Sequence, residues 1–415
     1  MSLPVLSLLA LAAAIVLSCF SAINVGFVSI ALAFVVGVGF GGMKVQEVAA
    51  GFPSSLFLVL VGVTLLFGQA AVNGTLDKAA RQSVRLARGN PGRIPLIFFA
   101  LAAALSAAGA GNIAATALLA PVAMAAAGRA GISAFLMTIA VATGASAGGL
   151  SPFAPTGVIA NGLLARAGIT GAAWFTFGSN FAAEAFVGIA GYLALGGAKL
   201  LARGAGSVEA AAPEEPFTWN QKLTLALIGA LIASVVFFNI DVGMGAFLAA
   251  GVLTLARASD EAAALKALPW NTIVMVCGVT VLISILEKTG GMELFTTLLA
   301  RFSTPTTITG VIAFVTGVIS VYSSSSGVVL PAFLPLVPGL VEKLGAGANP
   351  LAIAASINVG AHLVDVSPLS TLGALCMAAA PAMEDRTALF HKLLAWGLSM
   401  SVVAAIVCFV FFGLL

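Results

Sequence analysis

Long apolar runs constrain this chain more than any other feature of its sequence. Runs of about 20 apolar residues, the length needed to cross a ~30 Å hydrocarbon core, recur from residue 5 to residue 415. The 415 residues are 60% hydrophobic and 8% charged, against roughly 25% charged in soluble domains. No segment remains that could form a sizeable soluble domain. Lipid must therefore be the solvent for most of the chain, and the sequence predicts an all-α polytopic membrane protein.

The reactive side chains are too scattered to indicate an enzyme. The four cysteines lie in apolar stretches without C-x-x-C spacing, so we interpret them as small core residues. There are two histidines, no P-loop and no convincing triad. The basic residues are spread among loops, so no nucleic-acid partner is predicted. Residues 1–4 lack a basic n-region, and we interpret the first apolar run as a retained span.

Hydropathy and helix breakers together predict ten spans and two re-entrant hairpins. The spans lie near residues 5–21, 23–42, 54–72, 132–163, 173–201, 220–238, 241–257, 270–287, 349–380 and 387–415. Two further apolar stretches, about 94–127 and 306–344, are interrupted midway by Gly-rich or Ser-rich segments. Each is predicted to be a helical hairpin that enters and leaves on one side.

Basic residues predict the orientation. The strongest basic cluster, in segment 74–90, follows the third span and should face the cytoplasm as an interfacial amphipathic helix. Its members are Lys78, Arg81, Arg85 and Arg88, with Arg93 just beyond. Both termini are then predicted to lie outside a bacterial inner (plasma) membrane. The four tryptophans are predicted to anchor span ends at the interface; they are Trp174, Trp219, Trp270 and Trp396.

Short motifs recur between the two halves of the chain. Residues 62–64 (Gly-Val-Thr) return at 278–280, and 151–152 (Ser-Pro) return at 367–368, both 216 positions later. Because each half has five spans, an odd number, plus one hairpin, the second half should enter the membrane from the opposite side. We therefore predict two inverted repeats, 1–201 and 220–415, joined by a cytoplasmic linker at 202–219.

Four helix interruptions mark the predicted site. An unpaired backbone group in hydrocarbon costs several kcal/mol, so such breaks persist only where protein, water or ligand satisfies them. The interruptions are segments 109–112, 148–157, 323–327 and 365–373, two from each half. Half-helix N-termini favour anions, whereas half-helix C-termini and free carbonyls favour cations.

The polar side chains in these breaks suit carboxylates and hard cations. The hydroxyl and amide groups that we single out are those of Asn112, Thr156, Ser325, Ser326, Ser370 and Thr371. Their hydroxyl and amide groups can donate to carboxylate oxygens or coordinate a cation; for a lone Ser or Thr the alternative is a bond within its own helix. None of the four segments contains Lys or Arg. A bound dianion must then be balanced by backbone dipoles and bound cations, which predicts ion coupling.

Three ionisable residues fall within predicted spans, where such residues are functional candidates. His362 and Asp365 are three positions apart and could pair structurally or form a proton site. Glu184 is either a functional residue or simply lies near the end of its span.

With these motifs in place, the chain resembles the divalent-anion:sodium symporters of the ion-transporter superfamily, and is most similar to MatC-type malonate and dicarboxylate carriers. The similarity covers two repeats, two hairpins, the interfacial helix and both broken spans. That family has a Ser-Asn-Thr motif at each hairpin tip; residues 111–113 (Gly-Asn-Ile) and 325–327 (Ser-Ser-Gly) correspond here, so Asn112 and Ser325 retain the residue type. Its Gly-Thr-Pro-like turn resembles 155–157, with its partner at 370–371.

The resemblance implies a site, a co-transported ion and an assembly. Implied substrate contacts are Asn112, Ile113, Thr156, Ser325, Ser326, Gly327 and Thr371. Implied Na⁺ ligands are Gly111, Asn112, Pro155, Ser323, Ser326 and Ser370. It also implies a homodimer with an elevator mechanism, in which 94–163 and 306–380 move against a scaffold formed by the first two spans and 220–257.

The resulting hypothesis is a sodium-coupled importer of malonate or a C4-dicarboxylate. The first alternative is a proton-coupled carrier of the same anions that uses Asp365 or His362. An anion channel would need a continuous polar pore or charged rings, and a membrane enzyme would need a nucleophile within reach of a base. The sequence concentrates its polar residues at four breaks instead.

Overall fold

The computed structural model describes residues 2–21, 23–84, 87–204, 216–238, 240–381 and 384–414. All regular elements in these ranges are helical, as predicted. Most of the predicted linker 202–219 lies outside the described residues, as do residues 85 and 86 of the predicted interfacial helix.

The first half runs from α1 to α11. Its elements are α1 (Leu3–Phe20), α2 (Val25–Phe34), η1 (Val35–Phe40), α3 (Val45–Ala49), α4 (Ser54–Val72), α5 (Thr75–Val84), α6 (Arg93–Leu105), η3 (Ser106–Ala110), α7 (Gly111–Ala130), α8 (Ala134–Gly149), α9 (Pro155–Arg166), α10 (Ala173–Ala194) and α11 (Gly197–Ala202). The helices α6 and α7 form the first hairpin, and α8 and α9 are the two parts of the predicted span 132–163.

The second half runs from α12 to η6. Its elements are α12 (Trp219–Phe238), α13 (Val242–Leu255), α14 (Glu261–Ala267), α15 (Trp270–Lys288), α16 (Gly291–Arg301), α17 (Ile308–Tyr322), η4 (Ser325–Val329), α18 (Leu330–Phe333), η5 (Leu334–Leu336), α19 (Val337–Leu344), α20 (Pro350–Leu363), α21 (Thr371–Ala379), α22 (Arg386–Cys408) and η6 (Phe409–Gly413). The segment from η4 to α19 follows α17, contacts it at η4 and completes the predicted hairpin 306–344, and α20 and α21 divide the predicted span 349–380.

The helices form a multi-pass membrane protein. Six described segments are long and apolar enough to cross a membrane, and five shorter apolar helices accompany them. Large apolar side chains such as Phe237, Leu248 and Leu255 are more than 70% exposed. Such surfaces are stable only where lipid or another apolar partner covers them.

The two halves contact one another through exchanged pairs of helices. The helix α2 packs on α15 of the other half, and α4 packs on α13. At the first contact a β-carbon on Gly278 would collide with the backbone of Gly26, and at the second a β-carbon on Gly62 would collide with the carbonyl of Gly243. Gly278 lies 216 positions after Gly62, and Gly243 lies 217 after Gly26. The two contacts therefore use equivalent glycines from each half.

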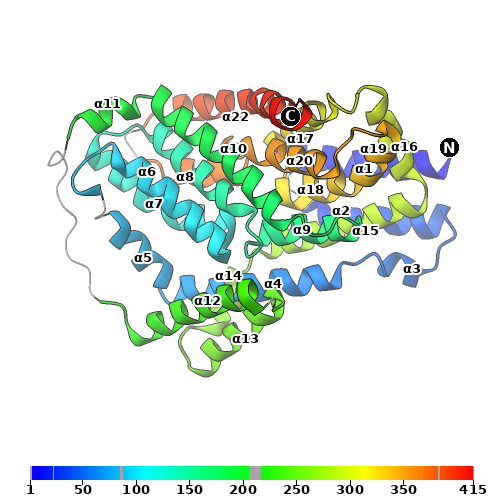
Figure 1. The fold of residues 1–415 in the computed structure, drawn as a ribbon. Helices are drawn as coiled ribbons and strands as arrows, with labels where there is room; N and C mark the ends of the chain where they lie inside the picture. The colour runs from blue at the N-terminus through cyan, green and yellow to red at the C-terminus, as the bar shows by residue number, and fades with distance from the viewer. Residues whose placement is uncertain are drawn as a thin grey trace.

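Basic residues lie at both ends of the molecule. In Figure 1, α5 and α11 lie at one end, while α3, α16, α19 and the N-terminus lie at the other. The first end carries Lys78 on α5 and Lys199 on α11, with Arg203 directly after α11. The other end carries Lys44, Arg301 and Lys343 beside the acids Glu47, Glu293 and Glu342. The side of a membrane that each end faces stays a prediction.

The interfacial role predicted for Trp396 is wrong. Trp174, Trp219 and Trp270 are at least 43% exposed near helix ends. Trp396 instead lies well inside α22, its ring contacts Phe135 at a centroid distance of 6.0 Å, and its indole nitrogen is buried. Packing between helices, which hydropathy does not report, placed this ring in the interior.

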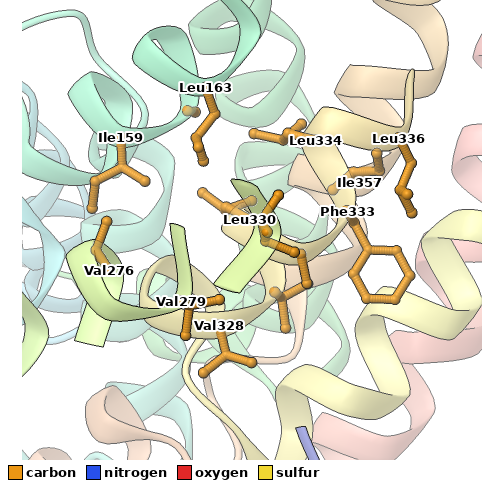
Figure 2. Close-up of a cluster of buried hydrophobic side chains, with 14 of the residues drawn as sticks. Ile159, Leu163, Val276, Val279, Val328, Leu330, Phe333, Leu334, Leu336 and Ile357 are labelled. Atoms are coloured by element: carbon orange, nitrogen blue, oxygen red, sulfur yellow. The ribbon is translucent and has the colours of Figure 1, made fainter. Parts of the chain in front are cut away.

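The largest apolar core holds the second hairpin in place. Figure 2 shows Leu334 of that hairpin pointing toward Leu163 of α9, with Leu330 nearby and Val276 of α15 beside Ile159, while the ring of Phe333 points away from α9. These side chains are at most 2% exposed. The second hairpin of one half is thus packed against the broken span of the other.

The close helix contact at Gly278 gives a stability prediction. We expect Gly278→Ala to lower the thermal midpoint of the purified protein, because the added methyl group overlaps the backbone of Gly26 and overpacking typically costs about 1–3 kcal/mol. The matched control is Gly251→Ala on α13, where a β-carbon meets open space. Alanine there is expected to leave the midpoint unchanged or raise it. Equal midpoints for the two variants would contradict the close contact.

Candidate functional site

The tip of the first hairpin is a glycine turn. Gly109 has φ +129° and Gly111 has φ +77°, backbone conformations that L side chains rarely adopt. A β-carbon at Gly109 would also overlap the ring of Phe67. The turn ends η3 and starts α7 at Gly111, so Asn112 lies in the first turn of α7.

The tip of the second hairpin is held by serine side chains. The helix α17 ends at Tyr322, and the hydroxyl of Ser324 accepts a hydrogen bond from the Gly327 N–H at 3.0 Å. The Ser325 hydroxyl donates to Oδ1 of Asp365 at 2.7 Å. Ser320 bonds both the Ser325 hydroxyl and the carbonyl of Ala361. The run of serines therefore stabilises a broken backbone and joins the hairpin to α20.

Each broken span contains a short loop between two half-helices. After α8, the Ser151 hydroxyl donates to the carbonyl of Ala107 at 2.7 Å, which ties the loop to the first hairpin. After α20, the Ser370 hydroxyl bonds the carbonyls of Asp365 and Ser367. The half-helix α9 starts at Pro155, a residue suited to the first helical turn. The half-helix α21 starts at Thr371.

The four breaks meet around two adjoining cavities. The larger cavity is about 350 Å³ and is lined by α4, the first hairpin, α9 and the start of α15. The smaller is about 30 Å³ and lies between the second hairpin, the loop after α20 and the first hairpin tip. Asn112, Ile113 and Ser326 line both.

The predicted site residues gather in this one place. The larger cavity is also lined by Gly111, Pro155 and Thr156, and the smaller by Ser323, Ser325, Asp365, Ser370 and Thr371. Gly327 is buried in the second tip itself and lines neither cavity. Their individual roles in binding substrate or sodium stay predictions.

Electrostatics in the two cavities favour different ligands. Among the described residues no lysine or arginine lines either cavity, and helices α7, α9 and α21 begin at their walls. Helix N-termini carry partial positive charge and free N–H groups, which favour an anion. The larger cavity is mostly apolar and has a volume typical of small-molecule sites. The smaller has room for one ion or water and presents the Asp365 carboxylate with several hydroxyls, which are hard-cation ligands.

His362 and Asp365 do not bond to each other. The Nδ1–H of His362 donates to the carbonyl of Asn358 at 2.7 Å, whereas Asp365 accepts from Ser325. The suggestion that Glu184 lies near a span end is wrong, because it is fully buried in the middle of α10. A proton-carrying role for His362 or Asp365 stays a prediction.

Sequence reasoning missed several residues at the site. Thr64 of α4 and Thr272 of α15 line the larger cavity, and the Ser18 hydroxyl of α1 bonds that of Ser323 at 2.8 Å. Thr64 belongs to the recurring Gly-Val-Thr motif, so its recurrence was a usable signal. Ser18 lies in an ordinary apolar span, and nothing near it in the sequence indicates the contact.

Comparison with known proteins supports this architecture. Residues 1–149, which run from α1 to the end of α8, match the family model of the dicarboxylate carrier protein MatC N-terminus. The YdaH transporter of Alcanivorax borkumensis has a TM-score of 0.57 and 18% identity, covering 88% of this chain and 87% of that one. MtrF of Neisseria gonorrhoeae, described as illuminating a class of antimetabolite efflux pumps, has a TM-score of 0.58 and 16% identity, covering 90% and 83%. At these identities the likeness shows a shared fold. None of the curated proteins matches the chain.

The Ser325–Asp365 bond predicts coupled stabilities. We expect Ser325→Ala to lower the thermal midpoint, because a buried carboxyl group that loses its donor costs about 1–3 kcal/mol. Asp365→Asn in the same chain should make Ser325→Ala less costly, so that the two effects are not additive. Ser399→Ala, which removes an exposed hydroxyl on α22, is the control. Strict additivity in the double-mutant cycle would show that the bond contributes nothing.

Proposed function

We propose that this chain is a secondary active transporter that imports a small dicarboxylate, malonate or a C4-dicarboxylate, together with sodium by an elevator mechanism. The observation that carries the proposal is the meeting of four helix breaks, two from each half, around two adjoining cavities of about 350 Å³ and 30 Å³ whose described walls contain no basic side chain. The match of residues 1–149 to the MatC N-terminus supports a dicarboxylate as the substrate class.

An inverted repeat accounts for the position of the site. Both halves present two spans, a connecting helix, a third span, an interfacial helix, a hairpin, a broken span and a last span in the same order. At the start of the second half-helix of each broken span, a β-carbon on Gly157 or Gly373 would collide with the carbonyl of Ser151 or Ser367. These pairs correspond at the offset of 216. In an inverted repeat the equivalent breaks meet near the membrane midplane, where substrates bind.

Charge balance is the reason to propose sodium coupling. A dicarboxylate adds two negative charges to a site that already contains the Asp365 carboxyl group and no basic residue on its walls. The N-termini of α7 and α9, with Asn112 and Thr156, can receive the carboxylates. Sodium ions can bind the hydroxyls of Ser323, Ser326 and Ser370 and nearby carbonyls, since hard cations prefer oxygen ligands. Co-binding then brings the site close to neutrality.

The proposed movement follows the packing of the helices. Segments 94–163 and 306–380, which carry the hairpins and broken spans, would move together. The helices α12 and α13 lie along one side, where α13 packs on α4 (Figure 1), and they suit the proposed scaffold of a homodimer. We place the protein in a bacterial inner membrane with both termini outside.

A proton-coupled carrier of the same anions is the second candidate. Its supporting observation is that His362, with an unpartnered Nε2, and Asp365 are both at least 94% buried, and that Asp365 lines the smaller cavity. A buried acid or base there could exchange a proton when the site opens.

Uptake into proteoliposomes separates the two candidates. We expect labelled malonate or succinate to accumulate when an inward sodium gradient is imposed at equal pH on both sides. A proton gradient imposed without sodium should give little uptake. Sodium-independent uptake that follows the proton gradient would overturn sodium coupling and favour the second candidate.

Removal of the Asn112 side chain tests the site itself. We expect Asn112→Ala to abolish dicarboxylate uptake while folded protein is recovered at normal yield, because Asn112 lines both cavities. The control is Asn220→Ala, which alters an exposed side chain on α12. Unchanged uptake kinetics in Asn112→Ala would remove Asn112 from the site.

A further inference from the structure

A second set of buried polar side chains lies on the three packed helices α8, α10 and α20, and none of its members lines either cavity described above. Glu184 and Asn180 are one helical turn apart on α10, which packs against both α8 and α20 (Figure 1). Ser146 lies on α8, and Asn358 and His362 are one turn apart on α20. All five side chains are at most 1% exposed.

Hydrogen bonds fix part of the cluster and leave its acceptors free. The Asn180 amide nitrogen donates to the Ser146 carbonyl at 2.9 Å, so the oxygen of that amide is directed elsewhere. The His362 Nδ1–H donates to the Asn358 carbonyl at 2.7 Å, which leaves Nε2 as an acceptor. The buried atoms without a partner are Glu184 Oε1 and Oε2, Asn180 Oδ1, Asn358 Oδ1 and Nδ2, His362 Nε2 and Ser146 Oγ.

These unpartnered atoms include more acceptors than donors, and Glu184 is the one acidic group among the five residues, so its ionised form would add a negative charge. Neither α8, α10 nor α20 contains a lysine or arginine. Buried polar atoms are almost always satisfied, and a buried charge without a partner is strongly unfavourable. A bound cation coordinated by several of these atoms would give the free acceptors a partner. It would also balance the charge of an ionised Glu184.

We propose that Glu184, Asn180, Ser146 and Asn358 form a sodium-binding site separate from the hairpin tips. Two carboxylate oxygens, two amide oxygens and a hydroxyl are the ligand types that hard cations bind. One carboxylate balances one monovalent ion. A single proton on Glu184 would satisfy one acceptor and leave the others unpartnered, so sodium accounts for more of the cluster.

The position of the cluster links it to the cavity at Asp365. The carboxyl groups of Glu184 and Asp365 interact electrostatically, and Asp365 is bonded to Ser325 at the second hairpin tip. A cation at Glu184 therefore lowers the negative potential at the tip and favours binding of an anion there; by linkage, the anion favours the cation. This link to transport rests on the proposed function, whereas the sodium site itself does not.

Sodium binding measured without any organic anion tests the site. Purified full-length protein is titrated with ²²Na⁺ at constant ionic strength in choline, and the thermal midpoint is followed in parallel. We expect Glu184→Gln to bind one sodium ion fewer per protomer than the unaltered chain and to lose part of the sodium-dependent stabilisation. Glu293→Gln, an exposed acid on α16 that pairs with Lys343 at 3.6 Å, should bind as many ions as the unaltered chain.

A second variant keeps the test decisive if Glu184→Gln does not fold. Ser146→Ala removes only a hydroxyl and should weaken the affinity of one sodium ion by about tenfold. Equal sodium counts and affinities in the Glu184, Ser146 and unaltered chains would overturn the site. So would a titration in which Glu184→Gln alters proton release and not sodium binding. Loss of one ion in Glu184→Gln supports the site even if no dicarboxylate is transported.

Discussion

The structure depends on one constraint, namely that backbone polar groups cannot stay unpaired in hydrocarbon. Four segments of this chain interrupt a helix, and each would be prohibitively costly if it faced lipid. The protein brings all four breaks together, so that serine hydroxyls, backbone carbonyls and half-helix ends form hydrogen bonds with one another. Ser151 bonds the first hairpin, and Ser325 bonds Asp365 of the second broken span. The remaining free N–H groups border a cavity, where a ligand can complete the pairing.

The same exclusion of water from the interior also explains why buried carboxyl groups in this protein need a positive partner. Burial removes water from carboxyl groups, and the chain supplies no lysine or arginine near Glu184 or Asp365 on the helices and cavity walls described. A dianion brought into such surroundings increases the deficit of positive charge. Helix N-termini offset part of it, but fixed dipoles cannot adjust to an ion that arrives and leaves. Mobile cations can, which gives sodium coupling a physical basis in both the proposed transport cycle and the proposed Glu184 site.

Much of the fold and site could be predicted because the underlying signals are local in sequence. Apolar runs located the spans, and Gly109, Gly111 and the serine run at 323–326 located the hairpin tips. The recurrence of Gly-Val-Thr and Ser-Pro indicated which segments would correspond. Side-chain surroundings were less predictable. His362 bonds its own helix and not Asp365, Trp396 is interior, and Ser18 reaches the second hairpin tip from a helix that shows no polar pattern.

The sequence by itself determined the solvent, the helical class and the places where helices must break, because hydropathy and the glycine, serine and proline breaks act over a few neighbouring residues. Only the tertiary structure decided which breaks share a cavity, how α2 and α4 exchange partners with α15 and α13, and where the acceptors around Glu184 collect. Those outcomes depend on the rotation and approach of helices that are distant in sequence. Close glycine contacts set that approach, and no local pattern encodes which helix lies opposite.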